Sequence, residues 1–353
     1  MTKEAKTKYL LGKQAIIAGV SMRVTLVARR GPNAPLRKIV SILDTLAVEY
    51  HLIHEVHPTP LSDTDLMVVV GGDKDILRTL HRLEQKQVPL LGVNEADGGG
   101  FLSEVNLSNF SEVFPRIVQG DYRVEEARRL QVVADGRPQA AALNEIAIFP
   151  ARSATLFEYA LNVDEEVVWR DYSDGIIIST ATGSTAYAMS AGGPMILHDA
   201  PVFAAVSVNS MDITRRPLII PASSKIRIEE ITSPSKCEAI IDGTLRTSVL
   251  DSVEVSQHPQ PARFVRLLET PKAMNKIAKK LRLAEELLRM PASAKLILKT
   301  LEYEGPLSHK DLMRKTMLPE RTARLALNLL VEKRLVKRQP LLRDARQRVY
   351  QVA

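Results

Sequence analysis

The stretch VVVGGDKDILR, residues 68–78, decides how the first part of the chain is expected to fold. Its valines predict a buried strand, its glycine pair predicts a tight turn, and the residues from Ile76 onward predict a helix. A helix that begins at a glycine turn presents backbone N–H groups to which phosphate can bind. Asp73 lies in this turn, and the local pattern leaves two interpretations open. It is either a catalytic carboxylate or an acid that caps the following helix.

Strands and helices alternate on both sides of this turn. Apolar spacing predicts strands at 23–28, 51–56, 66–70 and 88–93, with helices at 39–46 and 76–85. Such alternation predicts a parallel sheet with ligands bound at the C-terminal ends of its strands. We therefore expect an α/β domain over residues 22–125, after a flexible N-terminal extension at residues 1–21.

Residues 126–270 have a different texture. Short β-rich runs are separated by turns such as Asp135-Gly136 and Asp242-Gly243, which predicts a mostly β, sandwich-like domain whose last strand is 264–268. Asp242 is interpreted as part of a hairpin turn first and as a ligand contact second. One segment differs from its surroundings: DGIIISTATGSTAYAMSAGGP, residues 174–194, predicts a strand, a turn of small residues and then a helix.

The C-terminal part is helical and basic. We expect a linker helix at 271–290, followed over 291–353 by helices at 294–303, 309–315 and 320–333 and by strands at 336–339 and 349–352. Ser308 is the expected N-cap of the second of these helices. Three helices and a β-hairpin predict a winged helix-turn-helix domain. From residue 272 onward the chain has 20 Lys and Arg against eight Asp and Glu, a net +12, which leaves −5 for the rest of a chain whose total is +7. A basic tail domain of this kind points to a polyanionic partner.

Composition excludes several classes of protein. A single cysteine, Cys237, rules out an internal disulfide framework and a Cys-rich zinc site, and it fits a reducing cytoplasm. The longest apolar runs are far shorter than the roughly 20 residues that span a bilayer. Lys13 and Gln14 interrupt the apolar patch near the N-terminus, so no signal peptide is expected. None of the seven histidines falls at metal-ligand spacing; His51, His54 and His57 are expected on a surface strand and its loop.

Four stretches, taken together, resemble the NAD kinase family in its archaeal form. They are GGDKD (71–75), GVNEADGGGFLSEV (92–105), ALNEIAI (142–148) and the segment 174–194, and they match in order and spacing the family patterns GGDGT, GxNxGxxGFL, ALNE and DGxxxSTPTGSTAYxxSAGGP. The resemblance covers residues 22–268. It implies the NAD kinase fold, in which an α/β domain precedes a β-rich domain.

The resemblance also implies an activity and its residues. The activity is transfer of a phosphoryl group from ATP or polyphosphate, with Mg²⁺ accompanying the donor, to the 2′-hydroxyl of NAD, giving NADP in a cytoplasmic homo-oligomer. Asp73 would be the catalytic acceptor for that hydroxyl. The residues implied in nucleotide binding are Gly71, Gly72, Lys74, Asn94, Asn144, Glu145, Asp174, Thr182, Thr185, Ala186, Tyr187 and Ser190.

The sequence departs from the family patterns at three places. Lys74 and Asp75 replace Gly and Thr of the glycine loop, the stretch after Asn94 is one residue longer and lacks the glycine of Asn-x-Gly, and Ala181 replaces Pro. If the turn needs a positive φ at Lys74, its side chain would cost about 1 kcal/mol. Two of these changes lie at the expected phosphate-donor end, so we expect NAD or NADP binding to be better preserved than catalysis.

Two further hypotheses remain beside the kinase. The kinase-like body could act as an NAD(P) sensor that controls DNA binding by the tail. A lipid or sugar kinase sharing the Gly-Gly-Asp loop is the third, and the TGSTAY segment argues against it. The tail resembles the winged helix domains of MarR-type regulators, with a protein-contact role as the alternative to DNA binding. In its third helix we expect Leu325, Leu329 and Leu330 to pack inward. The residues expected to face DNA are Arg321, Arg324, Asn328, Arg343, Arg346 and Arg348.

Overall fold

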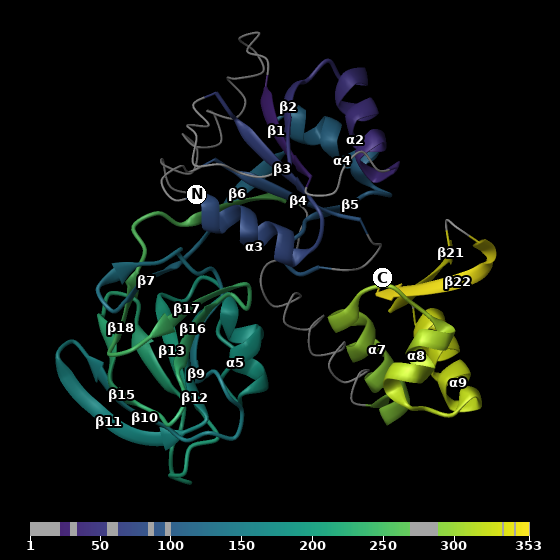
Figure 1. Cartoon of the computed structure of the whole chain (residues 1–353). Helices are drawn as coiled ribbons and strands as arrows, with labels where there is room; N and C mark the ends of the chain where they lie inside the picture. Colours follow the sequence, from purple (N-terminus) through teal and green to yellow (C-terminus); the bar gives the residue numbers. More distant parts are fainter. Residues whose placement is uncertain are drawn as a thin grey trace. The chain divides into compact units, whose positions relative to one another are not determined.

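The computed structural model describes residues 22–28, 34–54, 63–83, 88–95, 100–268, 289–333, 335–341 and 344–352 (Figure 1). The chain divides into two compact units, Met1–Met274 and Asn275–Ala353. The expected N-terminal extension and nearly all of the expected linker helix lie outside the described residues. No helix in these ranges is long and apolar enough to cross a membrane.

The first unit begins with a mainly parallel sheet, as the alternation of strands and helices predicted. Its elements are β1 (Arg23–Ala28), α2 (Ala34–Thr45), β2 (Glu49–Ile53), β3 (Leu66–Val70), α3 (Asp73–Arg82), β4 (Leu90–Asn94), β5 (Val105–Asn106), α4 (Phe110–Val118) and β6 (Tyr122–Ala127). Strands β1, β2, β3, β4 and β5 pair in parallel, in the order β2-β1-β3-β4 with β5 beside β4. The Gly-Gly-Asp turn therefore lies at the C-terminal end of a central strand, β3.

Both faces of this sheet are covered, which explains why β3 is apolar at every position. Leu66, Val68 and Val70 pack in one cluster with residues of α2 and α4. Met67 and Val69 point to the opposite face, where they pack with Ile76 and other residues of α3. This second cluster also contains Leu143, which comes from a later part of the chain. Helix α3 is thus packed on its own sheet and against the segment that carries Asn144.

The final strand of the first unit, β19 (Ala262–Leu267), corrects one expectation. Residues 264–268 were expected to complete the β-rich domain, whereas β19 returns to the first sheet, parallel to β4 and antiparallel to β6. The apolar pattern of a strand does not specify its partner, because pairing depends on contacts between residues far apart in the sequence. The α/β sheet is therefore completed by a strand that follows the β-rich domain in the sequence.

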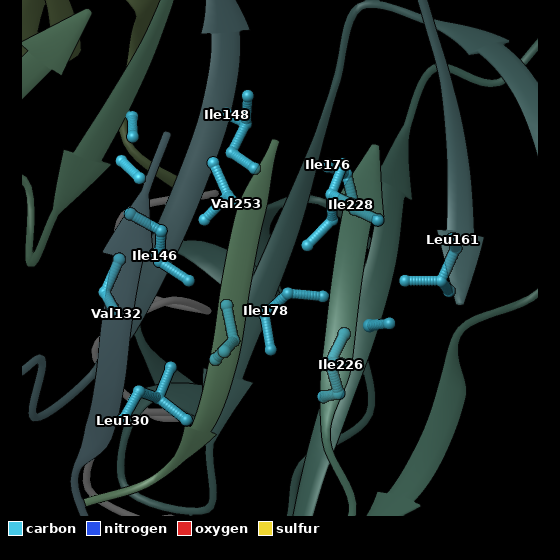
Figure 2. Close-up of a cluster of buried hydrophobic side chains, with 14 of the residues drawn as sticks. Leu130, Val132, Ile146, Ile148, Leu161, Ile176, Ile178, Ile226, Ile228 and Val253 are labelled. Atoms are coloured by element: carbon cyan, nitrogen blue, oxygen red, sulfur yellow. The ribbon is translucent and has the colours of Figure 1, made fainter. Parts of the chain in front are cut away.

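The β-rich domain is a sandwich of two antiparallel sheets, as predicted. One sheet has the order β11-β10-β15-β18-β7-β8 and the other β14-β13-β12-β9-β16-β17. Their elements are β7 (Leu130–Ala134), β8 (Arg137–Pro138), β9 (Glu145–Pro150), β10 (Phe157–Val163), β11 (Glu166–Ser173), β12 (Gly175–Thr180), η1 (Gly183–Thr185), α5 (Tyr187–Ser190), β13 (Val202–Val208), β14 (Leu218–Pro221), β15 (Ile226–Thr232), β16 (Cys237–Ile241), β17 (Leu245–Val249) and β18 (Val253–Gln257). Figure 2 shows aliphatic side chains of both sheets gathered in one buried cluster, with Ile146 and Ile178 from one sheet and Val132 and Val253 from the other.

Over its described residues, the second unit contains three helices and a small antiparallel sheet. They are α7 (Ala292–Glu304), β20 (Leu307–Ser308), α8 (His309–Thr316), α9 (Glu320–Glu332), β21 (Val336–Leu341) and β22 (Asp344–Val352), with strand order β20-β22-β21. The Ser308 cap is confirmed, since its hydroxyl accepts from the Asp311 backbone N–H at 3.2 Å. The strands are longer than predicted, and β20 was not expected.

The packing of α9 corrects a second expectation. Leu330 is buried and Leu329 partly buried, as predicted, but Leu325 is 63% exposed. Ala323, Ala326 and Leu327 fill the inward face in its place. A helix buries residues three and four positions apart, and Ala323, Leu327 and Leu330 form such a set.

Candidate functional site

The carboxylate of Asp73 is fixed by backbone groups from a distant loop. Asp73 is the first residue of α3, whose N-cap is Gly72, so it is not the helix-capping acid of the simpler interpretation. Its oxygens accept hydrogen bonds from the N–H of Phe101, at 2.9 and 3.0 Å, and from the N–H of Leu102, at 3.0 Å. The fold thus brings Phe101 and Leu102 to the GGDKD turn, although 28 and 29 positions separate them from Asp73.

The helix N-terminus beside Asp73 is capped by Asp75. The Asp75 carboxylate accepts from the Gly72 N–H at 3.2 Å, which is the half of a capping box that the third helical residue supplies; Gly72 has no side chain to supply the other half. Gly71 has φ 149°, and a Cβ at this position would overlap the Asp75 carboxylate. The strain expected at Lys74 is absent, because Lys74 lies in the first turn of α3 with negative φ and an exposed side chain. The Lys-Asp pair is therefore compatible with a regular helix start.

Asn94 lies at the base of the same turn. It ends β4 and is 8% exposed. A Cβ at Gly100 would come within 2.7 Å of the Asn94 amide nitrogen and 3.1 Å of an Asp73 oxygen, and Gly100 has φ 88°. Only glycine fits this close approach without a shift. Asn94 and Asp73 therefore meet at Gly100, although 20 positions separate them.

The Asn144-Glu145 pair is held by a residue that the sequence did not single out for this role. Asp242 accepts from the backbone N–H groups of Leu143 at 2.9 Å, Asn144 at 2.7 Å and Glu145 at 3.1 Å. Asp242 and Gly243 have φ of 48° and 61°, so the predicted hairpin turn between β16 and β17 is confirmed. The same residue also organises the ALNE segment about 100 positions earlier, and no local signal could have revealed this.

The TGSTAY turn packs directly on Asn144. A Cβ at Gly183 would overlap the carbonyl group of Asn144. Thr180 fastens the turn from below: its hydroxyl donates to the Leu143 carbonyl at 2.7 Å and accepts from the Gly183 N–H at 3.0 Å. Thr182, Thr185 and Ala186 are half-buried around this turn. The ALNE and TGSTAY stretches therefore form one structural unit.

An open surface adjoins this unit. Tyr187 is 44% exposed and stacks on Phe149, with ring centroids 5.9 Å apart. Partial burial and the nearby charges of Glu145 and Asp174 raise the pKa of the Tyr187 phenol. The phenol therefore keeps its proton up to its ordinary pKa and beyond, which makes it a hydrogen-bond donor at neutral pH. Asp174 and Ser190 are exposed, and Asp174 accepts from the Asn209 side chain at 2.7 Å.

The residues expected to bind DNA lie in the second unit. Arg321, Arg324 and Asn328 are all exposed on α9, and Arg324 pairs with Glu320 at 2.7 Å. Arg348 is exposed on β22. Arg343 lies outside the described residues, and the side chain of Arg346 is not described.

The described residues contain no group of three or more His, Cys, Asp or Glu side chains that could hold a metal ion.

The chain is similar in sequence and in fold to known proteins of one family. The profile of the ATP-NAD kinase N-terminal domain matches residues 29–122, and that of the ATP-NAD kinase C-terminal domain matches residues 143–267. The NAD kinase of Thermococcus sibiricus is 32% identical over 278 residues, which are 73% of this chain and the whole of that protein. The NAD kinase of Methanopyrus kandleri is 32% identical over 208 residues, 59% of this chain and 75% of that protein. The chain belongs to the NAD kinase family.

Solved structures agree with this assignment. An NAD kinase from Archaeoglobus fulgidus in complex with ATP has a TM-score of 0.64 at 27% identity, covering 74% of this chain and 99% of that one. A yeast NADH kinase complexed with NADH shares the fold, with a TM-score of 0.63 at 22% identity. The residues in which this chain departs from the family's glycine loop, Lys74 and Asp75, lie in the first turn of α3.

Proposed function

We propose that this protein is an NAD kinase that transfers a phosphoryl group from ATP or polyphosphate to the 2′-hydroxyl of NAD. The observation that carries the proposal is the Asp73 carboxylate, which two backbone N–H groups hold at the end of β3. An ionised carboxylate has about four acceptor sites. Its two N–H donors therefore leave room for a substrate hydroxyl, and they hold the carboxylate in one orientation, which supports a role in orienting that hydroxyl.

The nucleoside would bind along the unit formed by the ALNE and TGSTAY stretches. Asn144 and Glu145 would bind the adenosine portion of NAD, and Thr182, Thr185, Ala186, Tyr187 and Ser190 would line the site, with Asp174 toward the nicotinamide. The close packing of Gly183 on Asn144 supports this arrangement, because it keeps the two stretches at a constant separation. A preformed surface of this kind limits the entropy lost on binding.

The donor phosphates would approach the N-terminus of α3. Gly71, Gly72, Lys74 and Asn94 surround this point. Lys74 is exposed and can pair with phosphate, whereas the Asp75 carboxylate occupies the Gly72 N–H that a phosphate would otherwise use. Mg²⁺ bound to the donor would offset part of its negative charge.

The decisive assay measures NADP formation by the full chain and by D73N, a variant that keeps the size of the side chain and removes its charge. D44N, at an exposed position on α2, is the matched control. We expect D73N to lose at least about 100-fold in kcat, the scale of a general-base contribution, and D44N to retain it. Equal activity of D73N and wild type would refute the role of Asp73.

The same assay separates the kinase from the sensor alternative. Asp75 on the Gly72 N–H is the observation that favours a weakened enzyme. A wild-type protein that binds NAD or NADP by calorimetry and forms no NADP would establish the sensor. A protein that does neither would exclude both.

We also propose that the second unit is a winged helix domain that binds DNA. Arg321, Arg324, Leu325 and Asn328 are spaced i, i+3, i+4 and i+7 on α9, and all four are exposed. They form one face on which arginines can contact guanine and the leucine can contact a thymine methyl group. The alternative of a protein-only contact is tested in the same experiment.

The test is a gel shift of random duplex DNA at low salt with the full chain, R321A and K299A. Each variant removes one exposed positive charge, on α9 or on α7. R321A is expected to weaken binding severalfold, because it removes one charge that can pair with phosphate, and K299A much less. The absence of any shift for wild type at low salt would refute DNA binding.

We propose a homo-oligomer on the basis of one apolar loop of the first unit. Met211 and Ile213 are 70% and 88% exposed. The loop is nevertheless tied down, because Ser210 donates to the Asp171 carboxylate at 2.6 Å and Arg215 lies 4.5 Å above the Trp169 ring. Apolar groups on an ordered loop are typical of an interface. Light scattering should show that M211D/I213D lowers the oligomer mass; an unchanged mass would exclude this loop as the interface.

A further inference from the structure

The proposed catalytic carboxylate and the proposed nucleoside-binding pair come from different layers of the first unit. Asp73 begins α3, which packs on the parallel sheet, whereas Asn144 and Glu145 precede and begin β9 of the sandwich. Phosphoryl transfer to a hydroxyl of a bound nucleoside requires both groups in one geometry, and an error of about 1 Å can cost 100-fold in rate. The contacts that join α3 to residues 141–145 therefore bear on the reaction.

His81 makes the first of these contacts. It lies on α3 two turns after Asp73, with its side chain 3% exposed. Its Nε2 lies 2.8 Å from the Asp242 carboxylate, which itself holds the N–H groups of residues 143–145. Asp242 is 0% exposed in its side chain, so all four of its donors come from the protein. His81 is the donor that belongs to the other layer.

The hydrogen bonds of the His81 ring determine which of its two nitrogens carries a proton. A carboxylate accepts only, so Nε2 must carry a proton. The Thr244 hydroxyl lies 3.4 Å from Nδ1 and also 3.4 Å from the Ile241 carbonyl. A neutral ring can accept from this hydroxyl, and a charged ring can donate to it while the hydroxyl turns to Ile241. The link to Asp242 is therefore kept in either protonation state.

Arg129 makes the second contact. It is 2% exposed, and its guanidinium donates to the α3 carbonyl of Leu80 at 3.0 Å and to that of Leu83 at 3.3 Å. It also donates to the Ala141 carbonyl at 3.2 Å. The Leu80 carbonyl also accepts from the Leu83 N–H at 3.1 Å, so Arg129 adds a second donor at the C-terminal end of α3, where backbone carbonyl groups lack a full set of helical partners. One side chain thus ties that end to the start of the ALNE segment.

We infer that His81 and Arg129 are positioning residues, which set Asp73 relative to Asn144 and Glu145 through α3. Neither touches the proposed substrate site, and their effect is transmitted by a helix of ten residues with buried apolar contacts to Leu143. His81 joins the side of α3 to Asp242, and Arg129 joins the C-terminal end of α3 to Ala141. Two such contacts can hold the first residue of a rigid helix at a constant position relative to the sandwich. The inference rests on the proposed kinase function for its kinetic consequence, and on the fold alone for the geometry.

The experiment compares wild type, H81A, H81Q and H51A as full-length chains. H81A removes the donor to Asp242, H81Q keeps an N–H donor of similar reach, and H51A is a matched histidine deletion at an exposed position on β2. Steady-state NADP formation is normalised to the folded fraction measured by circular dichroism. We expect H81A to lower kcat/KM for NAD by about 10- to 100-fold, H81Q to recover most of that loss, and H51A to match wild type.

A structural role alone would give a different result. H81A with a lower Tm and with wild-type kcat and KM per folded molecule would overturn the inference. If H81A does not fold, R129K provides the test: it keeps the charge, but a single ammonium group cannot span the carbonyl groups of Leu83 and Ala141 as the guanidinium does. A folded R129K with wild-type kcat/KM for NAD would also overturn the inference.

Failure of the proposed function can be distinguished from failure of this inference. If wild type forms no NADP, the kinase proposal fails, and calorimetry with NAD then tests the positioning role. H81A should raise the Kd for NAD about tenfold relative to wild type, because Asn144 and Glu145 lose part of their support. Equal Kd values for the two proteins would overturn the inference independently of catalysis.

Discussion

Two glycines of the proposed site, Gly183 and Gly72, are small for different reasons. At Gly183 a Cβ would overlap the Asn144 carbonyl group, so the fold itself requires glycine. At Gly72 the backbone has φ −87°, which any residue can adopt, and a Cβ would meet no atom of the described residues within 4 Å. Glycine at this position would allow a ligand to approach the backbone closely, which is the role proposed here for Gly72.

The two ends of the proposed site are built differently. The proposed nucleoside end is held by internal contacts. Thr180 and Asp242 form hydrogen bonds to residues 143–145, and Gly183 packs against Asn144. At the proposed phosphate end, the Gly72 N–H instead donates to the charged side chain of Asp75. Mutations of the residues packed inside the first end should therefore act mainly on stability, whereas mutations at the second end and at the exposed Tyr187 should act on ligand kinetics.

The largest effect is expected for G183A. Forcing a methyl group into the Asn144 backbone should lower the free energy of unfolding by about 3 kcal/mol, the upper part of the range for overpacking. Urea denaturation measures this. G192A is the control, because Gly192 has φ 82° with no described atom near its Cβ, and it should cost only about 1 kcal/mol. Equal costs for the two variants would show that the Gly183 contact does not constrain the fold.

The reverse pattern is expected for G72A. An added methyl group reduces the entropy of the unfolded chain and weakens the N-cap, and these small terms should leave the free energy of unfolding within about 0.5 kcal/mol of wild type. In the proposed kinase, the KM for ATP should rise about tenfold, because the methyl group blocks approach of phosphate to the backbone. A stable G72A with an unchanged KM would remove Gly72 from the donor site.

A smaller effect is expected at Asp75. D75N keeps the shape of the side chain and removes its charge from the helix N-terminus. Removing repulsion of about 1 kcal/mol should lower the KM for ATP about fivefold. D75T, which restores the residue of the family pattern, should act in the same direction. The difference from wild type should shrink as salt is added, because the interaction is screened; a KM that rises in D75N would show that Asp75 assists the donor.

The smallest effect is expected at Tyr187. Loss of its exposed ring in Y187A should raise the KM for NAD about threefold, in keeping with a stacking contribution near the lower end of the usual range, with little change in stability. Y187F keeps the ring and should stay near wild type. A large loss in Y187F would instead assign the main role to the phenolic hydroxyl, whose proton is retained at neutral pH.

Much of the fold could be predicted from local patterns. Valine-rich strands, glycine turns and amphipathic helices identified the parallel sheet, the β sandwich, and the helices and hairpin of the second unit, because burial of one or both faces selects apolar residues at a set spacing and a tight turn selects glycine. The expectations that failed concerned partners and faces. β19 returned to the first sheet, Leu325 lay on the outside of α9, and Lys74 fitted a helical turn without strain. Each depends on what packs against the element, and periodicity alone leaves that open.

The candidate site divides in the same way. The sequence by itself determined which residue types are present: an acid after a glycine pair, an Asn-Glu pair at a strand end, and a turn of small hydroxylated residues. Only the tertiary structure decided that Phe101 and Leu102 hold Asp73, that Asp242 holds residues 143–145, and that His81 and Arg129 join the two layers. Backbone N–H and C=O groups are the same in nearly every residue, so the sequence does not indicate which of them a side chain such as Asp73 or Asp242 will bind. These contacts join residues 12 to 161 positions apart, and they therefore depend on the tertiary structure.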